Sequence, residues 1–348
     1  MNRRLTRPGR FRAAAIVGHA ALALTLFGSM VVGVAAQDAT PTTSAFAPDA
    51  AKGMTFGLIQ KSGDQEYFID EARGFRDTIE AAGGDVIVQD VQLDASAAMN
   101  AVDTMISAGV NGIAIVVPDQ KIGPAVIEKA QAANIPLIAL DDVIADADGR
   151  DAPFAGFDGT DMGTKVGEEA AKLWTESGWG SDGVGVLSLE VEALSVCNQR
   201  TDAARKMMTE AGFPAANILK VPYDGTAPKA IDAASTVITA HPEFTKWVVW
   251  ACNDEGVQGA LRALESAGVT ADNVIGVGLG AYLACPEWKS GNPTGFKAAL
   301  YISGVDVGIS GAEALLGAAI NGTPLPEKAI AKTTMTTPEN YQDSGLSC

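Results

Sequence analysis

Short apolar runs alternate with segments of helical periodicity along most of the chain. The runs are MTFGLI at 54, VIV at 86, GIAIVV at 112, PLIAL at 136, GVGVLSL at 183, WVVW at 247, VIGVG at 274 and FKAALYI at 296. Continuous apolar strands that alternate with amphipathic helices are typical of parallel sheets with helices on both faces. The pattern therefore predicts an α/β fold built on parallel sheets.

The helical segments carry their apolar residues on one stripe and end at glycine. In the first segment the stripe is followed by Gly83 and Gly84, and its members are Phe68, Ala72, Phe75, Ile79 and Ala82. A second helix is expected to end at Gly109 and a later one at Gly268. Because such units fill both halves of the chain, we predict two similar open-sheet lobes. Periodicity alone leaves a closed barrel of eight units as an alternative.

The N-terminal segment has the features of an export signal. Five arginines precede an apolar run from Ala13 to Ala36, and the first 36 residues end in the small-residue pattern Val34-Ala35-Ala36. Residues 37–52 are rich in Ala, Thr and Pro without an apolar period, which predicts a flexible leader. No other stretch approaches the ~18 apolar residues of a membrane span. The mature chain is therefore expected to be exported without inserting into a membrane.

Charge and histidine content narrow the classes of function. Removal of the signal takes away five arginines and leaves 312 residues with 20 Lys and Arg against 42 Asp and Glu, a net charge of −22. Such a surface repels phosphate backbones and anionic lipid headgroups, which disfavours nucleic acid and membrane-surface partners. The mature chain has a single histidine, His241, before a proline at an expected helix exit. This disfavours histidine base catalysis and histidine-ligated metal sites.

The four cysteines lie too far apart for a CxxC metal or redox motif. They are Cys197, Cys252, Cys285 and Cys348. An even number in an exported chain indicates disulfides, for which three connectivities are possible. Free buried thiols are the alternative.

A glycine pattern after one strand resembles a cofactor motif in outline. Gly276, Gly278 and Ala281 spell GxGxxA, the dinucleotide-binding pattern. The acidic residue that should follow about twenty positions later at a second strand end is missing. We interpret the glycines as a tight strand-to-helix turn and expect no cofactor.

Polar and aromatic residues gather directly after the predicted strands. In an open parallel sheet, ligands bind outside the carboxyl ends of the strands. Side chains of these types hydrogen-bond hydroxyl groups or stack on a sugar ring. The residues at the strand ends are Lys61, Asp64, Gln65, Tyr67, Asp119, Asp141, Asp142, Phe157, residues 190–200, Cys252, Asn253, Asp254 and Glu255.

Most of these residues have a structural alternative. Lys61 could be a solvated loop lysine, Arg200 could form a surface salt bridge, and Asp254 could cap the helix that follows it. The adjacent Asp141 and Asp142 could suggest an acid and base pair. Neighbouring residues at a strand end point to opposite sides, however, which disfavours a shared catalytic proton.

Seven stretches occur in an order that is typical of one protein family. They are GLIQKSGDQEYF, VVPDQKIGPAVIEKA, IPLIALDD, NQRTDAARKMMTEAGFP, IDAASTVITAHPEFTKW, ACNDEGVQGALRA and VIGVGLG. In this order the chain resembles the type I periplasmic sugar-binding proteins of ABC transporters, and most closely their L-arabinose-binding branch. The resemblance covers residues 54–342, nearly all of the mature chain.

The resemblance implies two Rossmann-like lobes joined by three hinge crossings. The first lobe would comprise residues 54–157 and 303–329, and the second residues 158–302 and 330–348. It implies a monomeric binding protein, not an enzyme, in the periplasm or at the outer face of the cytoplasmic membrane. Such a protein captures a pentose or hexose between its lobes and delivers this monosaccharide to an ABC transporter permease.

The resemblance also implies a set of ligand-binding residues. Lys61 and Tyr67 match a lysine and a stacking aromatic, and Arg200 matches the arginine that bonds the ring oxygen. Asp142 matches the carboxylate that meets the anomeric hydroxyl. Phe157, which like Tyr67 could be a core aromatic, takes an apolar position at the first crossing. The complete set is Lys61, Gln65, Tyr67, Asp141, Asp142, Phe157, Leu194, Arg200, Cys252 and Asn253.

The chain departs from the arabinose-type pattern at several positions. Gln65 replaces a glutamate, Cys252 a methionine, and Gly280 and Leu283 an asparagine and an aspartate. An unpaired ligand hydroxyl lowers the binding free energy by about 1 to 3 kcal/mol. The loss of these polar contacts therefore leaves the identity of the sugar open. The resemblance places Cys252 and Cys285 after neighbouring strands of the second lobe, which favours a disulfide between them.

Two other functions remain as alternatives. One is a periplasmic sugar sensor that passes a signal to a receptor. The other is an exported sugar-active enzyme, which needs two carboxylates about 5 to 9.5 Å apart across a cleft. Asp141 or Asp142 with Glu190 or Asp254 are the candidates for such a pair.

Overall fold

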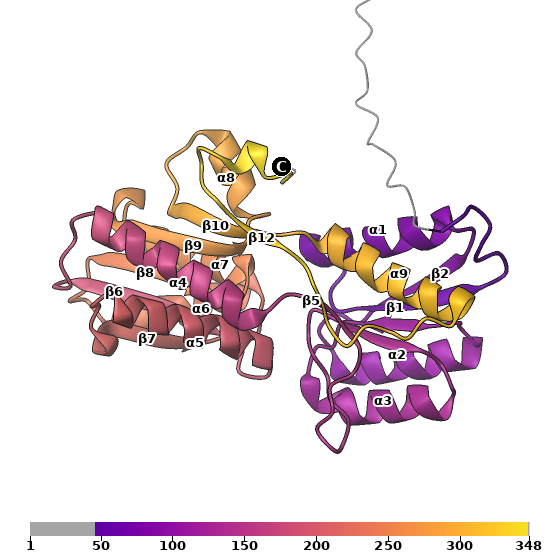
Figure 1. Cartoon of the computed structure of the whole chain (residues 1–348). Coiled ribbons are helices and arrows are strands. Elements are labelled where there is room, and N and C mark those ends of the chain that lie inside the picture. Colours follow the sequence, from indigo (N-terminus) through magenta and orange to yellow (C-terminus); the bar gives the residue numbers. More distant parts are fainter. Residues whose placement is uncertain (1–45, 347) are drawn as a thin grey trace, which may run out of the picture. The chain divides into compact units, whose positions relative to one another are not determined.

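The computed structural model describes residues 46–346 and 348. The predicted signal peptide, residues 1–36, and residues 37–45 of the predicted leader lie outside the described residues. The described part contains two six-stranded sheets, each with helices on both faces (Figure 1). Neither sheet closes on itself, so the predicted α/β fold with two open-sheet lobes is confirmed and the barrel is excluded.

The first lobe is a sheet with the strand order β11-β5-β4-β3-β1-β2. Its elements are β1 (Thr55–Gln60), α1 (Glu66–Ala81), β2 (Asp85–Asp90), α2 (Ala95–Ala108), β3 (Ile113–Ile115), η1 (Gln120–Ile122), α3 (Gly123–Ala132), β4 (Leu137–Leu140), β5 (Phe154–Gly156), α9 (Gly304–Asn321) and β11 (Ala329–Ile330). All its strand pairs are parallel. Helices α1 and α9 cover one face and α2 and α3 the other, with buried side chains from β1 and β3 pointing to both.

The second lobe is a sheet with the strand order β12-β10-β9-β8-β6-β7. Its elements are α4 (Gly159–Glu176), β6 (Val184–Glu190), α5 (Ser195–Glu210), η2 (Ala215–Asn217), β7 (Ile218–Pro222), α6 (Ala227–Ala240), β8 (Lys246–Ala251), α7 (Asp254–Ser266), η3 (Ala271–Asn273), β9 (Val274–Gly280), α8 (Ala284–Ser290), β10 (Phe296–Ile302), β12 (Thr333–Thr336) and η4 (Tyr341–Asp343). Its pairs are parallel except for β10 with β12, which is antiparallel. Helices α4 and α5 cover one face, and α6 and α7 cover the other.

Sequence periodicity located most of these elements because their strands are buried on both faces. Strands β6 and β9 are buried at every position, and α2 ends as predicted at Gly109, which has a φ of 66°. Strand β7 was not predicted. It lies at the sheet edge, where Lys220 and Pro222 are exposed and interrupt the apolar run.

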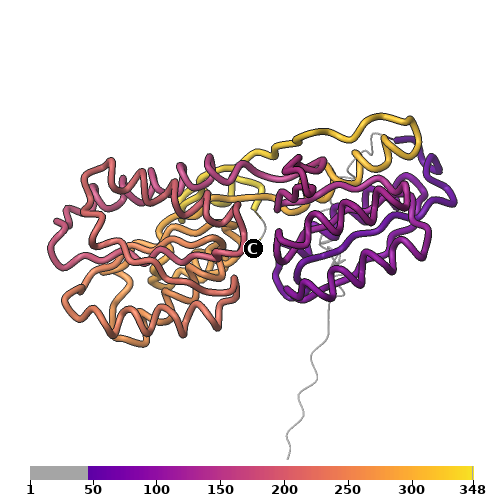
Figure 2. Tube along the Cα trace, turned by 90° about the horizontal axis from the view of Figure 1, so that it is seen from below, coloured from indigo at the N-terminus to yellow at the C-terminus, as the bar shows by residue number. Residues whose placement is uncertain are grey.

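Three segments connect the lobes. The chain passes to the second lobe between β5 and α4, returns between β10 and α9, and passes again between β11 and β12; the last passage is the yellow segment in Figure 2. One predicted boundary needs a correction. Ile330 was assigned to the second lobe, but it pairs with Gly156 in the first sheet.

The described end of the predicted leader is ordered by contacts with the first lobe. Ala51 is fully buried, and its N–H donates a hydrogen bond of 2.8 Å to the carbonyl of Ala82. Phe46 packs against the same core as α1 and α9. The prediction of a flexible leader is therefore wrong for residues 46–52, because its few apolar side chains have a core to pack against.

Candidate functional site

The strand ends of both lobes line one cavity of about 510 Å³. Nine of the ten predicted ligand residues lie in its wall: Lys61, Gln65, Tyr67, Asp141, Asp142, Leu194, Arg200, Cys252 and Asn253. Phe157 does not line the cavity. It is buried in the hydrophobic core just after β5, so the prediction of a ligand role for Phe157 is wrong and the core interpretation is correct.

Lys61 and Asp142 form a buried ion pair in the first-lobe wall. The Lys61 Nζ lies 2.7 Å from the Asp142 Oδ2, and the two side chains are only 9% and 2% exposed. The lysine follows β1 and the aspartate follows β4, two strands that are separated only by β3 in the sheet. Lys61 is therefore not a solvated loop lysine. The pair presents one cationic and one anionic group at the cavity.

Tyr67 and Asp141 form the second polar pair of this wall. The Tyr67 hydroxyl donates a hydrogen bond of 2.8 Å to Asp141, whose backbone adopts a left-handed conformation with φ 54°. Burial raises the pKa of Asp141 to about 6. Asp141 and Asp142 thus have different partners, as the opposite directions of adjacent side chains predicted.

Glu71 is a buried carboxyl group beside this wall that the sequence analysis missed. It is fully buried in α1, and neither of its side-chain oxygens has a hydrogen-bond donor among the described residues. Burial and the nearby charge of Asp141 raise its pKa well above the ordinary value. The only sequence signal was its position one helical turn after Tyr67.

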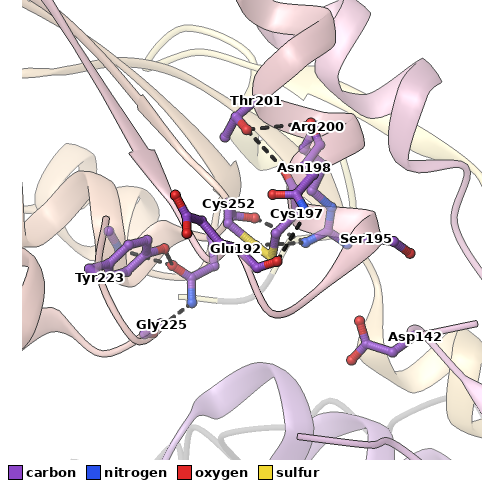
Figure 3. The surroundings of a disulfide bond; sticks show 12 residues. Asp142, Glu192, Ser195, Cys197, Asn198, Arg200, Thr201, Tyr223, Gly225 and Cys252 are labelled. Carbon is purple, nitrogen blue, oxygen red and sulfur yellow. Dashed lines mark hydrogen bonds between the residues drawn. A yellow bond between two sulfur atoms is a disulfide. The ribbon is translucent and has the colours of Figure 1, made fainter. Parts of the chain in front are cut away.

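Arg200 lies in the second-lobe wall and is held by the backbone of a neighbouring strand end. Its Nη1 donates a hydrogen bond of 3.0 Å to the carbonyl of Cys252, as Figure 3 shows. Its Nε is buried without a partner, and it forms no ion pair with any described carboxylate. The surface salt-bridge alternative is therefore wrong. The guanidinium keeps donors available for a ligand.

Asn253 caps α7 and also faces the cavity. Its Oδ1 accepts hydrogen bonds from the Gly256 N–H and the Tyr223 hydroxyl, and its Nδ2 donates one of 2.8 Å to Gly225. One N–H of the amide remains for a ligand. The alternative that Asp254 is the cap is wrong, because Asp254 turns inward and is fully buried.

Tyr282 and Glu255 occupy the region where the expected polar residues are replaced by Gly280 and Leu283. The Tyr282 hydroxyl donates a hydrogen bond of 2.8 Å to Glu255, and burial raises the pKa of Glu255 to about 7. Tyr282 lines the cavity, with its ring centroid 6.4 Å from that of Tyr67. Tyr282 comes just after the predicted strand at 274, which was the available signal, whereas Tyr223 follows β7, which the sequence did not predict.

Gly276 and Gly278 of the GxGxxA pattern lie inside β9, and only Ala281 falls in the turn that follows the strand. An added Cβ at Gly278 would lie 2.5 Å from the Oδ1 of Asp254. The Asp254 Oδ2 accepts a hydrogen bond of 3.0 Å from the Leu283 N–H, which holds the turn after β9. Burial raises the pKa of Asp254 to about 6. The glycines thus have a structural role, as predicted, but they serve the close packing of β9 and do not form the predicted strand-to-helix turn.

Two disulfides are present, and the predicted pairing is wrong. Cys197 is bonded to Cys252, and Cys285 is bonded to Cys348. Cys197 lies in the first turn of α5, which brings it to the end of β8, whereas Cys285 in α8 faces the chain end. Tyr341, near that chain end, packs against α8, and its ring centroid lies 5.7 Å from that of Trp288. The free-thiol alternative is also wrong.

The carboxylates considered for an enzyme on the second lobe either form ion pairs or lie outside the cavity. Glu190 lines the cavity, but its oxygens form ion pairs with Arg205 and with Lys220, the latter at 3.3 Å. Asp254 does not line the cavity. His241, the C-cap of α6, lies 2.9 Å from Glu243 and not in the cavity.

Neither a metal-binding cluster nor a membrane-spanning helix occurs among the described residues. No group of three or more His, Cys, Asp or Glu side chains in this part of the chain is arranged to hold a metal ion. Across residues 46–346, no helix has both the length and the apolar character for crossing a membrane.

Sequence comparisons agree with the geometry. A model of the periplasmic binding protein domain matches residues 56–318. The ABC transporter L-arabinose-binding periplasmic protein of Azospirillum brasilense is 30% identical over 297 residues, which cover 83% of this chain and 88% of that protein. The L-arabinose-binding periplasmic protein of Escherichia coli is 29% identical over 72% of this chain and 77% of its own length.

Solved structures share the fold. An ABC transporter periplasmic solute-binding protein from Actinobacillus succinogenes, with bound D-allose, superimposes with a TM-score of 0.71 at 23% identity, and the match covers 83% of this chain and 99% of that one. A solute-binding protein from Bacillus halodurans, with bound myo-inositol, gives a TM-score of 0.70 at 20% identity, covering 84% and 98% of the two chains.

Proposed function

Because the chain belongs to the periplasmic binding protein domain family, we propose that it captures one monosaccharide between its lobes and delivers it to an ABC transporter permease. The ligand class is a pentose or hexose related to L-arabinose, the sugar in the names of two relatives. The protein works as an exported monomer and carries out no covalent chemistry.

The observation that carries this proposal is the chemistry of the two cavity walls. Lys61 and Asp142 from the first lobe face the same cavity as Arg200 and Asn253 from the second. Charged donors and acceptors form the stronger hydrogen bonds to hydroxyl groups, and the ring of Tyr67 suits the C–H face of a sugar. Glu190, one of the carboxylates considered for hydrolysis, forms ion pairs with Arg205 and Lys220, and Asp254 lies outside the cavity, which supports binding over hydrolysis.

The second-lobe wall also bears on the choice of sugar. Tyr282 and Glu255 bond to each other in the region of Gly280 and Leu283, where arabinose-type members are expected to have two polar contacts. The edge of the sugar on this side would meet an aromatic ring instead of an amide and a carboxylate. We therefore expect a preference among monosaccharides that differs from that of the arabinose-type pattern.

The first experiment is a thermal-shift panel of L-arabinose, D-galactose, D-ribose, D-xylose and D-allose. A ligand at 100 times its dissociation constant adds ~2.7 kcal/mol to the free energy of unfolding, which such a screen detects. A protein that no monosaccharide stabilises would refute the proposal. Product release from a sugar glycoside would instead favour the enzyme, and a partner receptor in place of a permease would favour the sensor.

Calorimetry then tests the site. Arg200→Ala and Asp142→Asn should each weaken binding of the selected sugar at least tenfold, about 1.4 kcal/mol, because each removes a charged hydrogen-bonding group. Arg73→Ala is the matched control, since Arg73 is 59% exposed and pairs with Asp70 outside the cavity. Unchanged affinity in both site variants would refute this assignment of the ligand residues.

Small-angle scattering tests the mechanism. A sugar that contacts both lobes raises the population of a closed state, so the radius of gyration should fall on binding. A stabilising sugar that leaves the radius unchanged would rule out hinged closure.

A further inference from the structure

The disulfide Cys197–Cys252 forms part of the cavity wall. Both cysteines line the cavity and are nearly fully buried, at 2% and 4% exposure. They belong to a small apolar cluster, separate from the main cores, whose other buried members are Val191, Leu194 and Val196. The second disulfide, Cys285–Cys348, lies outside the cavity wall. Only one of the two crosslinks can therefore act directly on a ligand site.

The disulfide restrains a helix end that has no local cap. Leu194 occupies the N-cap position of α5 without a side-chain hydrogen bond, and the first turn has no acidic residue. An uncapped helix start leaves backbone N–H groups unsatisfied and frays easily. The Ser195 N–H bonds to Gln120 of the first lobe, at 2.6 Å, so it depends on the other lobe. Within the second lobe, the crosslink at Cys197 ties this turn to β8.

Two proposed ligand residues adjoin the same crosslink, and Figure 3 shows one of them, Arg200, beside it. Arg200 lies three residues after Cys197, on the same side of α5, and its guanidinium donates to the carbonyl of Cys252. Its Nη1 also lies 3.8 Å from the Cys252 sulfur. Asn253 directly follows Cys252. The bond thus joins the helix that carries the arginine to the strand end that supplies its acceptor and carries the asparagine.

We propose that the Cys197–Cys252 disulfide is a positioning element of the sugar site, so that sugar binding depends on its oxidised state. This inference rests on the proposed function. Without the bond, the first turn of α5 and the end of β8 are joined by noncovalent contacts alone, and the acceptor of Arg200 is less firmly fixed. The sugar must then order these groups on binding, which weakens affinity through loss of preorganisation.

Paired double variants separate this role from general stabilisation. Cys197→Ala/Cys252→Ala opens a crosslink with a sequence separation of 55, and Cys285→Ala/Cys348→Ala opens one of 63. The two loops that these disulfides close are so similar in length that chain entropy predicts nearly equal losses of stability for the two double variants. The probe is the sugar of the panel that stabilises the wild type most. The first variant should lose about tenfold in affinity and the second less than about twofold. Equal affinities in wild type and first variant would overturn the proposal.

A redox equilibrium gives a second measurement that uses the unmodified protein. Dithiothreitol supplies two electrons and two protons, becomes a cyclic disulfide, and converts Cys197–Cys252 into two thiols. By linkage, the sugar must shift this equilibrium toward the disulfide by the same factor by which reduction weakens binding. Differential alkylation with peptide mapping measures both disulfides with and without sugar. A shift at Cys285–Cys348 alone, or at neither bond, would overturn the proposal.

Hydrogen exchange without ligand distinguishes failure of this proposal from failure of the sugar-binding function. The first double variant should exchange faster at residues 195–201 and 252–256 than the wild type, while the second should not. If no sugar binds the wild type, the sugar-binding function fails and the dependence of binding on the bond fails with it. Exchange then still decides whether the disulfide restrains these two segments. If sugar binds and exchange is unchanged in both variants, the positioning role alone is refuted.

Discussion

Removal of the Lys61 ammonium would leave the Asp142 carboxylate buried without its counter-ion. The ion pair has an Nζ to Oδ2 distance of 2.7 Å, and Asp142 is 2% exposed, so solvent compensates the lost cation poorly even though the pair borders the cavity. Loss of one partner from a buried pair costs about 3 to 5 kcal/mol, because the remaining charge is not compensated. We expect Lys61→Met to lower the free energy of unfolding at pH 7 by that amount while keeping the volume of the side-chain stem.

Urea unfolding measures this loss, and two further variants make it specific. Lys129→Met removes a lysine that pairs with Asp103 at 2.5 Å, but those side chains are 39% and 54% exposed. The exposed pair should contribute only about 0 to 1 kcal/mol. The double variant Lys61→Met/Asp142→Leu should regain most of the stability, because it also removes the buried charge. A loss for Lys61→Met no larger than for Lys129→Met would refute the reasoning.

Two further predictions concern other parts of the site. Because burial raises the pKa of Asp141 to about 6 from 3.8, the folded protein retains a proton that the unfolded chain releases, so the free energy of unfolding should fall as pH rises from about 4 to about 6. Asp141→Asn should remove this contribution; a difference between the two urea-unfolding curves that does not vary with pH would contradict it. At the contact of α4 with α5, an added Cβ at Gly163 would lie 2.1 Å from the Arg200 carbonyl oxygen. Gly163→Ala should therefore lower the free energy of unfolding by about 1 to 3 kcal/mol, and it should weaken sugar binding because it displaces α5. Gly180→Ala, whose Cβ would meet nothing closer than 3.9 Å, should change stability by less than about 0.5 kcal/mol, and equal effects of the two substitutions would argue against this packing.

The hydrophobic pattern was sufficient for the two lobes because local rules decide which segments form buried strands and covering helices. A run such as VIGVG is apolar at every position only when both faces of its strand are covered, and β9 is buried throughout. The same logic fails at β7, an edge strand with exposed Lys220 and Pro222. Its sequence does not carry the signal of a buried strand, because half of its surface meets solvent.

The strand-end rule brought Lys61, Asp142 and Arg200 to one cavity without knowledge of their partners. Position along a strand determines which edge of the sheet a residue reaches, and this is a local property. Which of two adjacent residues turns inward is not a local property. The helix cap is Asn253, although Asp254 was considered for this position. That choice depended on the hydrogen bond from the Leu283 N–H to Asp254, 29 residues away in the chain and adjacent only in the fold.

The sequence by itself thus determined the fold class, the export signal as an expectation, and the residue types that face the cavity. Only the tertiary structure decided the pairing of the cysteines and the burial of Glu71 beside Asp141. Cys197 and Cys252 are 55 residues apart, and their Cα atoms lie 4.9 Å apart because α5 begins beside the end of β8. Such proximity arises when helices dock on a sheet, and no periodicity along the chain encodes it, since periodicity records which face a residue presents and not what meets that face.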